Sequence, residues 1–309
     1  MSKTDLFKKF MGKPLNYEYE HSFELIEKYE LKDFDCELYF QSNGVRPDGR
    51  VTYQRVMMAF PKNIKGKLPA VVVPFYYPEA AMGFDPKKEE YIEKYKDNPI
   101  MLDIVKQGYI AVSGESYYLT YSDYDGDNEG LERWEYVAKI FNKEHPEWSG
   151  IGKLVYDTSL LIDAVERDYR ADNNKIGIFG HSLGGKIAFI SGCIDKRIKV
   201  IVASDFGLLW HQTNWQDEWY WGEKLDKIKE AGLENYMLLQ EAGQKPFCLI
   251  AGHYDTFESC KTLYDIQEYK DCAERIFALN HRSGHRPPKY AAKAGYLFLD
   301  RWLKKEMLL

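Results

Sequence analysis

A serine between closely spaced glycines is the residue of this 309-residue chain whose surroundings best suit covalent chemistry. Ser182 lies in Gly180-His181-Ser182-Leu183-Gly184, which matches the pattern G-x-S-x-G. At a sharp turn from a strand into a helix, such a serine exposes its hydroxyl, and the glycines let strand and helix approach closely. Apolar segments precede and follow the motif, as this turn requires. We therefore predict that Ser182 is a nucleophile and that the backbone N–H of Leu183 binds the developing oxyanion.

A serine hydroxyl needs a histidine to take its proton and a carboxylate to orient that histidine. Four histidines follow Ser182 in the chain, namely His211, His253, His281 and His285. We favour His285 as the base because it lies in the loop 280–288, between the last apolar segment and a C-terminal amphipathic stretch. His281 is the alternative. His181 cannot easily fold back onto the neighbouring hydroxyl, so we interpret it as packing or as pocket lining.

Two aspartates follow predicted strands and could orient His285. Asp255 comes shortly after the apolar segment 246–251, and we favour it as the third catalytic group. Asp205 follows the preceding predicted strand and is the alternative; its other interpretation is a carboxylate that binds the local backbone. Glu115 is a weaker candidate because it precedes the serine in the chain.

Aromatic residues are expected to surround the reacting ester. The second oxyanion donor belongs in the loop after the apolar segment 70–75, where the backbone N–H of Tyr76 or of Tyr77 can serve; we assign this role to Tyr76 and substrate binding to Tyr77. Tryptophans crowd the segment 206–222, and we predict that three of them line the pocket: Trp210, Trp215 and Trp219. Indole rings suit sugar rings, aromatic acyl groups and acyl chains alike. Alternatively, these tryptophans attach an insertion to the domain or bury a dimer contact.

Short apolar segments alternate with amphipathic stretches from Pro69 onward, which is typical of parallel strands covered by helices on both faces. The predicted strands are 70–75, 109–112, 175–179, 199–203, 246–251 and 275–279. The predicted helices are 91–107, 154–170, 183–193 and 289–304. Upstream, 36–41 and 51–60 predict an antiparallel hairpin at the sheet edge. The fold class is therefore α/β with a mostly parallel central sheet, whose strand carboxyl ends carry the site.

Composition and charge limit the remaining possibilities. We predict a single domain over 1–309, with an N-terminal extension over about 1–50 and an aromatic, cap-like insertion over about 206–240. A net charge of −6 argues against nucleic acid as a partner. The charged N-terminus has no apolar run, so we expect no membrane association and a cytoplasmic location. Five cysteines without C-x-x-C spacing argue against disulfides and zinc, so no cofactor or metal is expected.

With the serine, acid and histidine loops in place, the chain resembles the dienelactone hydrolase and acetyl xylan esterase-like branch of the α/β-hydrolase superfamily. The resemblance extends from residue 69 to the C-terminus and rests on Gly180–Lys186, Asn280–Pro288 and Asn214–Gly222. It implies the α/β-hydrolase fold and a serine esterase that works through an acyl-enzyme intermediate, and it implies this chemistry more firmly than any substrate. The partner that we expect is a small-molecule ester, carbohydrate-linked or aromatic. The His-Gly pair that many of these hydrolases carry in the oxyanion loop is absent, and Tyr76 and Tyr77 follow the first strand instead.

Two other functions are compatible with the same residues. A peptidase or a thioesterase would use the same three catalytic groups. A non-catalytic protein could keep the fold and its aromatic pocket to bind a small molecule. The sequence leaves open whether the chain forms a homo-oligomer.

Overall fold

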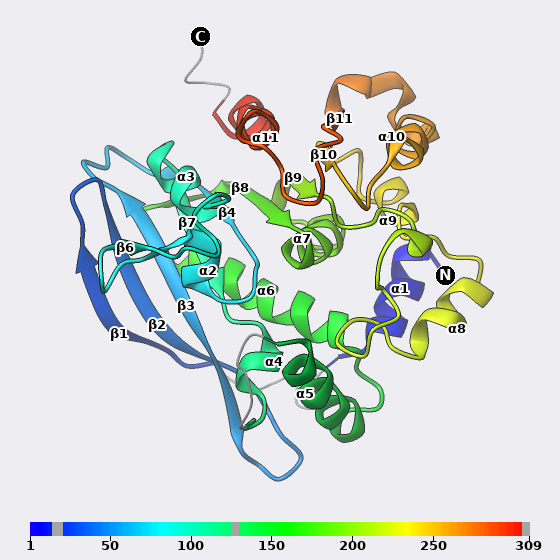
Figure 1. Ribbon diagram of the computed structural model, residues 1–309, viewed down its shortest axis with the longest axis horizontal. Helices are drawn as coiled ribbons and strands as arrows, with labels where there is room; N and C mark the ends of the chain where they lie inside the picture. The colour runs from blue at the N-terminus through cyan, green and yellow to red at the C-terminus, as the bar shows by residue number, and fades with distance from the viewer. Residues whose placement is uncertain (14–20, 125–129, 305–309) are drawn as a thin grey trace.

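A nine-stranded mixed sheet organises the part of the chain that the computed structural model describes, residues 1–13, 21–124 and 130–304. The spatial order of its strands is β1-β2-β3-β7-β4-β8-β9-β10-β11 (Figure 1). The strands in chain order, together with the small β5–β6 pair outside this sheet, are β1 (Phe23–Glu30), β2 (Phe34–Val45), β3 (Val51–Pro61), β4 (Leu68–Val72), β5 (Phe84–Asp85), β6 (Glu90–Tyr91), β7 (Ile110–Gly114), β8 (Ala171–His181), β9 (Ile198–Ser204), β10 (Phe247–Ala251) and β11 (Ile276–Asn280).

The six strands from β7 to β11 in this spatial order are parallel, while β1, β2 and β3 are antiparallel. β7 and β10 are buried along their whole length, because helices cover both faces of the sheet. This is why these strands appear in the sequence as continuous apolar segments. The predicted fold class is therefore confirmed, including the antiparallel N-terminal strands.

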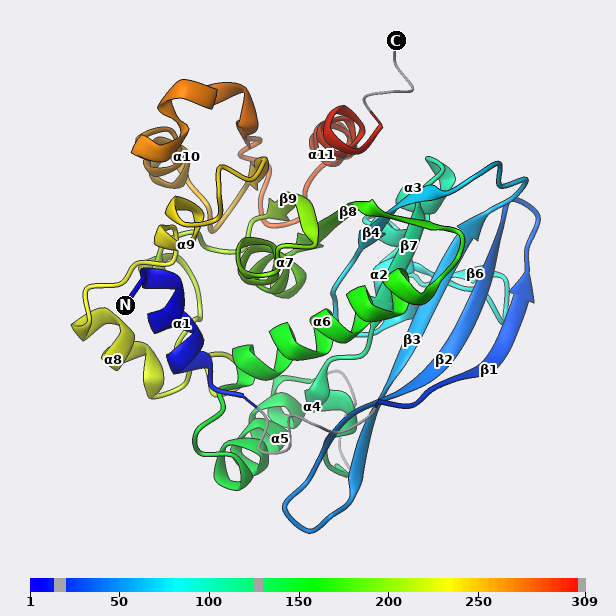
Figure 2. The same cartoon turned by 180° about the vertical axis from the view of Figure 1, so that it is seen from behind.

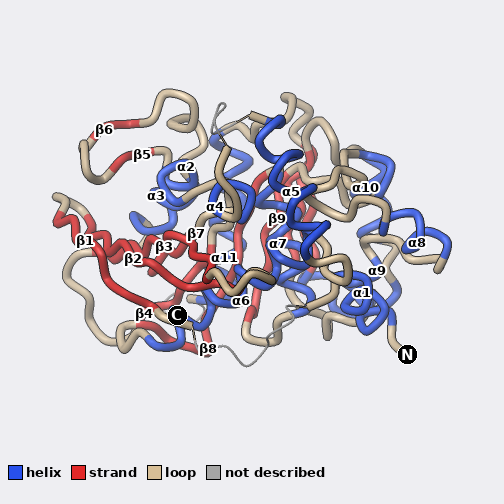
Figure 3. Tube along the Cα trace, turned by 90° about the horizontal axis from the view of Figure 1, so that it is seen from below, coloured by secondary structure: helices blue, strands red, loops and turns tan. Residues whose placement is uncertain are grey.

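The helices lie on both sides of the strands, as Figure 3 shows in blue and red. The helices are α1 (Lys3–Met11), α2 (Pro78–Met82), α3 (Ile100–Lys106), α4 (Tyr117–Thr120), α5 (Leu131–Glu144), α6 (Gly150–Arg167), α7 (Leu183–Ile194), α8 (Lys224–Glu230), α9 (Met237–Gln240), α10 (Phe257–Tyr264) and α11 (Lys289–Leu303), with 3-10 helices at Trp210–Gln212 and Gln267–Arg275. Among the described residues, none of these helices has the length and apolar character needed to cross a membrane.

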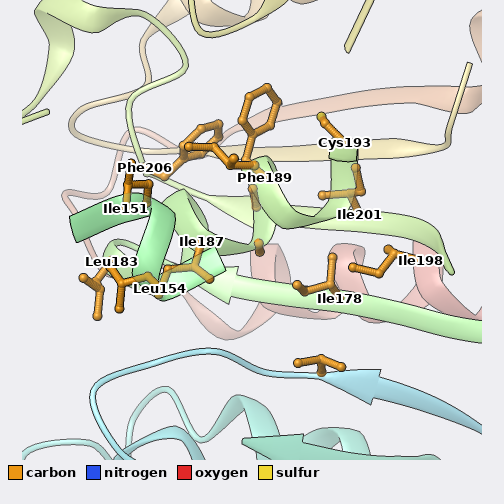
Figure 4. Close-up of a cluster of buried hydrophobic side chains, with 14 of the residues drawn as sticks. Ile151, Leu154, Ile178, Leu183, Ile187, Phe189, Cys193, Ile198, Ile201 and Phe206 are labelled. Carbon is orange, nitrogen blue, oxygen red and sulfur yellow. The ribbon is translucent and has the colours of Figure 1, made fainter. Parts of the chain in front are cut away.

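Helices cover both faces of the sheet (Figure 1, Figure 2), and a hydrophobic cluster on each face holds them in place. Ala70 and Val72 of β4 face the cluster of α6 and α7, whereas Val71 and Val73 face the cluster of α3 and α11. Figure 4 shows part of the first cluster, where Ile187 of α7 and Ile178 of β8 are drawn among its buried side chains. Because α7 is buried along nearly its whole length, the residue that begins it has a rigid support.

The structure differs from the sequence predictions at the edge strand β1 and at the helix predicted over 91–107. β1 pairs with the outer side of β2, so the predicted hairpin is not the sheet edge. β1 escaped prediction because both its faces are largely exposed and its apolar residues do not alternate cleanly with polar ones. The helix predicted over 91–107 is shorter and begins only at Ile100, directly after Pro99, because a proline disfavours helical backbone in the residue before it.

Candidate active site

Ser182 occupies the turn between β8 and α7 that the G-x-S-x-G motif predicts. Its backbone has φ +56° and ψ −118°, a conformation that non-glycine residues rarely adopt. A Cβ atom on Gly180 would lie 1.9 Å from the carbonyl oxygen of Gly184, and one on Gly184 would lie 2.1 Å from that of Pro74. Only glycines therefore fit where strand, helix and neighbouring loop meet.

A chain of two hydrogen bonds connects Ser182 to a histidine and a carboxylate. His285 Nε2 lies 2.8 Å from Ser182 Oγ, and His285 Nδ1 lies 2.7 Å from Asp205 Oδ2. The Asp205 side chain is fully buried, while 37% of the His285 side chain is exposed and Ser182 is half-buried. The structure thus brings the predicted serine and histidine together at a place that a ligand can reach.

Asp205 is held rigidly by the loop that follows β10. Its φ of +45° places it in the left-handed region, directly after β9. Its carboxylate accepts four backbone N–H groups at 2.8 to 3.1 Å, those of Gly252, His253, Tyr254 and Asp255. Burial raises the pKa of Asp205, but the hydrogen bonds from His285 and from this loop outweigh it and keep the pKa below its ordinary value. The carboxylate is therefore ionised and oriented at neutral pH.

The prediction that Asp255 orients the histidine is wrong in this structure. Its buried carboxylate accepts the backbone N–H groups of Phe206, Gly207 and Leu208 and the hydroxyl of Ser259. Each aspartate thus binds the loop that carries the other, and only Asp205 also reaches the imidazole. Both aspartates follow strand ends, so their positions in the sequence do not distinguish them.

His281, the alternative base, and His181, interpreted as packing or pocket lining, make no hydrogen bond to the serine hydroxyl in the structure. His281 is buried, accepts the backbone N–H of Ser283 at 3.1 Å and lies against Gly252. His181 is also buried, with its ring centroid 4.6 Å from that of His285. Burial lowers the pKa of His181 to about 3, so it is neutral and does not repel a positive charge on His285.

The loop after β4 lies beside the serine turn, because the carbonyl of Pro74 faces Gly184. Tyr76 and Tyr77 of this loop line a small cavity of about 60 Å³, together with Lys94, Tyr95, Leu119 and Trp134. Leu183 directly follows the serine and is the first residue of α7, where backbone N–H groups have no partner within the helix. The segments that carry the two predicted oxyanion donors therefore approach each other at Gly184, two residues after Ser182.

The three tryptophans predicted to line the pocket are core residues instead. Trp210 and Trp215 are 3% and 0% exposed, and their indole N–H groups donate to the carbonyls of Leu233 and Gly207 at 2.8 Å. Trp219 is 6% exposed. Its ring centroid lies 5.8 Å from that of Trp134 and 6.0 Å from that of Tyr220. The alternative interpretation, that the tryptophans attach the segment to the domain, agrees with this packing. Trp134, which the sequence did not single out, lines the cavity.

A buried lysine on α7 links the serine helix to this aromatic segment. The Lys186 ammonium donates to Thr213 Oγ1 at 3.2 Å and lies 5.0 Å from the ring centroids of Trp215 and Tyr220. Burial lowers its pKa to about 7.

Within residues 1–13, 21–124 and 130–304, no group of three or more histidine, cysteine or acidic side chains could hold a metal ion.

Known proteins share the fold of this chain and identify its family. A family model described as the Abhydrolase family matches residues 44–214, which include Ser182 and Asp205. A curated carbohydrate esterase from an unknown prokaryotic organism is 26% identical over 85 residues, which span 28% of this chain and 20% of that protein. The alignment thus spans one fifth of that relative.

Among solved structures, two esterases share the architecture over nearly the whole chain. A glucuronoyl esterase of carbohydrate esterase family 15 from Teredinibacter turnerae has a TM-score of 0.71 at 16% identity, covering 97% of this chain and 83% of its own. An acetyl xylan esterase from a Paenibacillus species has a TM-score of 0.58 at 16% identity, covering 97% and 91%. The expected resemblance to the α/β-hydrolases is confirmed. The chain has the α/β-hydrolase fold and belongs to the Abhydrolase family.

Proposed function

We propose that this chain is a serine esterase that hydrolyses carboxylic esters through an acyl-enzyme intermediate. The observation that carries the proposal is the pair of hydrogen bonds, 2.8 and 2.7 Å long, that joins Ser182 Oγ to Asp205 through His285. These are the groups, in the order, that activate a hydroxyl for attack on a carbonyl. The proteins similar to this chain support an ester linked to a carbohydrate as the substrate class. They are a carbohydrate esterase, a glucuronoyl esterase and an acetyl xylan esterase.

In the first half of the reaction Ser182 becomes acylated. Its Oγ attacks the acyl carbon while His285 Nε2 takes the hydroxyl proton, and the buried Asp205 carboxylate stabilises the resulting imidazolium. The carbonyl oxygen becomes an oxyanion, which the backbone N–H groups of Leu183 and Tyr76 are proposed to bind. His285 then gives the proton to the leaving alcohol as the ester C–O bond breaks.

In the second half, water releases the acyl group. His285 takes a proton from the attacking water, a second oxyanion forms at the same place, and its collapse returns the proton to Ser182 Oγ. The products are the free carboxylic acid and an unchanged enzyme. The exposed edge of His285 is what allows water to approach.

We further propose that the acyl group is small, of acetyl size. The cavity beside Tyr76 is small, with a volume of about 60 Å³. Aromatic rings form much of its wall, and such walls do not easily move aside to admit a longer chain. An acetyl group fits this space, whereas each further methylene displaces a ring.

Enlarging this cavity is expected to relax the acyl preference. We expect wild-type kcat/KM for a butyrate ester to be at least roughly tenfold below that for the acetate, since a methylene is worth 10- to 200-fold in a fitted pocket. Leu119→Ala removes part of the wall and should narrow this gap by roughly tenfold, measured with 4-nitrophenyl esters. Leu131→Ala, at a site 61% exposed, is the matched control and should keep the wild-type preference. Equal wild-type rates on acetate and butyrate would contradict the size limit.

The substrate class is tested with purified protein and three kinds of ester. We expect release of acetate from acetylated xylo-oligosaccharides, and slower or no cleavage of a methyl glucuronate ester and a feruloyl sugar. Cleavage of only the glucuronate or feruloyl ester would leave a serine esterase but reject the acetyl group. No hydrolysis of any ester, 4-nitrophenyl acetate included, would reject the proposed function.

A further inference from the structure

Ser116 makes two hydrogen bonds to the loop that carries the expected second oxyanion donor. Its hydroxyl donates to the carbonyl oxygen of Phe75 at 2.8 Å, and its backbone N–H donates to the carbonyl oxygen of Tyr76 at 3.0 Å. Ser116 is 3% exposed and follows the fully buried strand β7 after one intervening residue. Two successive peptide groups of the loop are thus held by one buried residue.

These bonds fix the direction of the neighbouring N–H groups. The described residues contain no cis peptide bond, and in a planar trans peptide the C=O and the N–H point in opposite directions. The peptide between Phe75 and Tyr76 points its oxygen at the Ser116 hydroxyl, so its N–H points away from Ser116. The peptide between Tyr76 and Tyr77 points its oxygen at the backbone N–H of Ser116, so its own N–H also points away from Ser116. The N–H groups of Tyr76 and Tyr77 therefore face the same side of the loop.

An arginine fixes Ser116 relative to the far end of the same loop. Arg55 Nε donates to Glu115 at 2.7 Å, and its two terminal nitrogens donate to Glu79 at 2.6 and 3.1 Å. Glu115 precedes Ser116, and Glu79 lies in the first turn of α2, which begins directly after Tyr77. The backbone N–H of Arg55 also donates to the Glu115 carboxylate, and the backbone N–H of Glu115 donates to the carbonyl oxygen of Arg55, at 3.0 Å each. The support beneath the loop is therefore rigid.

We propose that Ser116 is a positioning residue that turns the backbone N–H of Tyr76 toward the oxyanion formed at Ser182. The proposal rests on the serine esterase function proposed above. Ser116 does not touch the substrate; it acts by holding the peptide between Phe75 and Tyr76 in one orientation. Oxyanion donors act mainly on the transition state, so loss of this orientation affects kcat more than KM.

The test is Ser116→Ala, which removes the bond to Phe75 but keeps the backbone bond to Tyr76. Because loss of a whole oxyanion donor lowers kcat by 10²- to 10³-fold, we expect a misoriented donor to lower it by roughly 10- to 100-fold, with KM changed less than about threefold. Ser116→Thr keeps the hydroxyl and should restore most of kcat. Ser116→Ala should also slow the phosphonylation of Ser182 by a fluorophosphonate, because that reaction places an oxyanion in the same site.

Ser113→Ala is the matched control, because Ser113 is a fully buried serine on β7 whose hydroxyl has no hydrogen-bond partner among the described residues. It should keep wild-type kcat and the wild-type melting temperature. Wild-type kcat in Ser116→Ala, or an equal loss in Ser113→Ala, would overturn the role of Ser116 while the wild-type activity upholds the esterase. A wild-type chain that neither hydrolyses esters nor reacts with the probe would instead overturn the proposed function, and this role with it.

Discussion

Replacing His285 by alanine is expected to lower kcat for 4-nitrophenyl acetate by about 10⁶-fold, the loss that follows removal of the histidine from a serine-histidine-aspartate triad. The imidazole is the group 2.8 Å from Ser182 Oγ, and without it the hydroxyl keeps its proton. The side chain is 37% exposed and lies in a loop, so the variant should fold normally. Steady-state kinetics, with circular dichroism and thermal melting as the check on folding, measure both effects.

His281→Ala is the control for this variant, since His281 lies in the same loop and was the alternative base. Its ring is buried against Gly252, so the substitution should lower the melting temperature but leave kcat within about tenfold of wild type. If His285→Ala kept normal turnover while His281→Ala lost it, the base would be His281, and the hydrogen bond to Ser182 would have no catalytic role.

The second large effect is expected from Asp205→Asn, with a loss of about 10⁴-fold in kcat. The amide has nearly the same shape, and its oxygen can still accept backbone N–H groups of the loop after β10. It cannot balance the charge of the imidazolium, and it can stabilise the wrong tautomer of His285. KM should change little, because Asp205 is fully buried and does not reach the substrate.

Asp255→Asn is the matched comparison for Asp205→Asn, because the sequence analysis favoured Asp255 as the residue that orients His285. Its carboxylate binds the backbone after β9 and the hydroxyl of Ser259, so the variant should lose stability, by roughly 1 to 3 kcal/mol, and keep kcat within about tenfold. Urea unfolding and steady-state kinetics separate the two effects. A larger loss of kcat in Asp255→Asn than in Asp205→Asn would reverse the assignment.

Local sequence patterns predicted the elements that carry the serine and the histidine. Parallel strands such as β7 and β10 are buried on both faces, so they appear as continuous apolar segments, and the glycines around Ser182 occupy positions where a Cβ atom would collide with backbone. His285 followed from its place in the loop after the last such segment. These features depend on a few neighbouring residues, which is why a single sequence reveals them.

The acid and the pocket could not be predicted in the same way. Whether Asp205 or Asp255 reaches His285 depends on how two loops, about 50 residues apart in the chain, bind each other's backbone. The tryptophans of 206–222 gave only an aromatic composition, not the direction of each ring, and most of that surface is buried in the core. Ser116 and Trp134 carry no local motif, and they approach the site only after folding.

Reaction with a fluorophosphonate, followed by mass spectrometry of the digested protein, tests most directly whether Ser182 is an activated nucleophile. Attack by Oγ displaces fluoride and leaves one phosphonyl group on the peptide that contains Ser182. We expect one adduct per wild-type chain, none on Ser182→Ala and a greatly slowed reaction of His285→Ala. A wild-type chain that stays unmodified, or a Ser182→Ala variant modified to the same extent, would contradict the account.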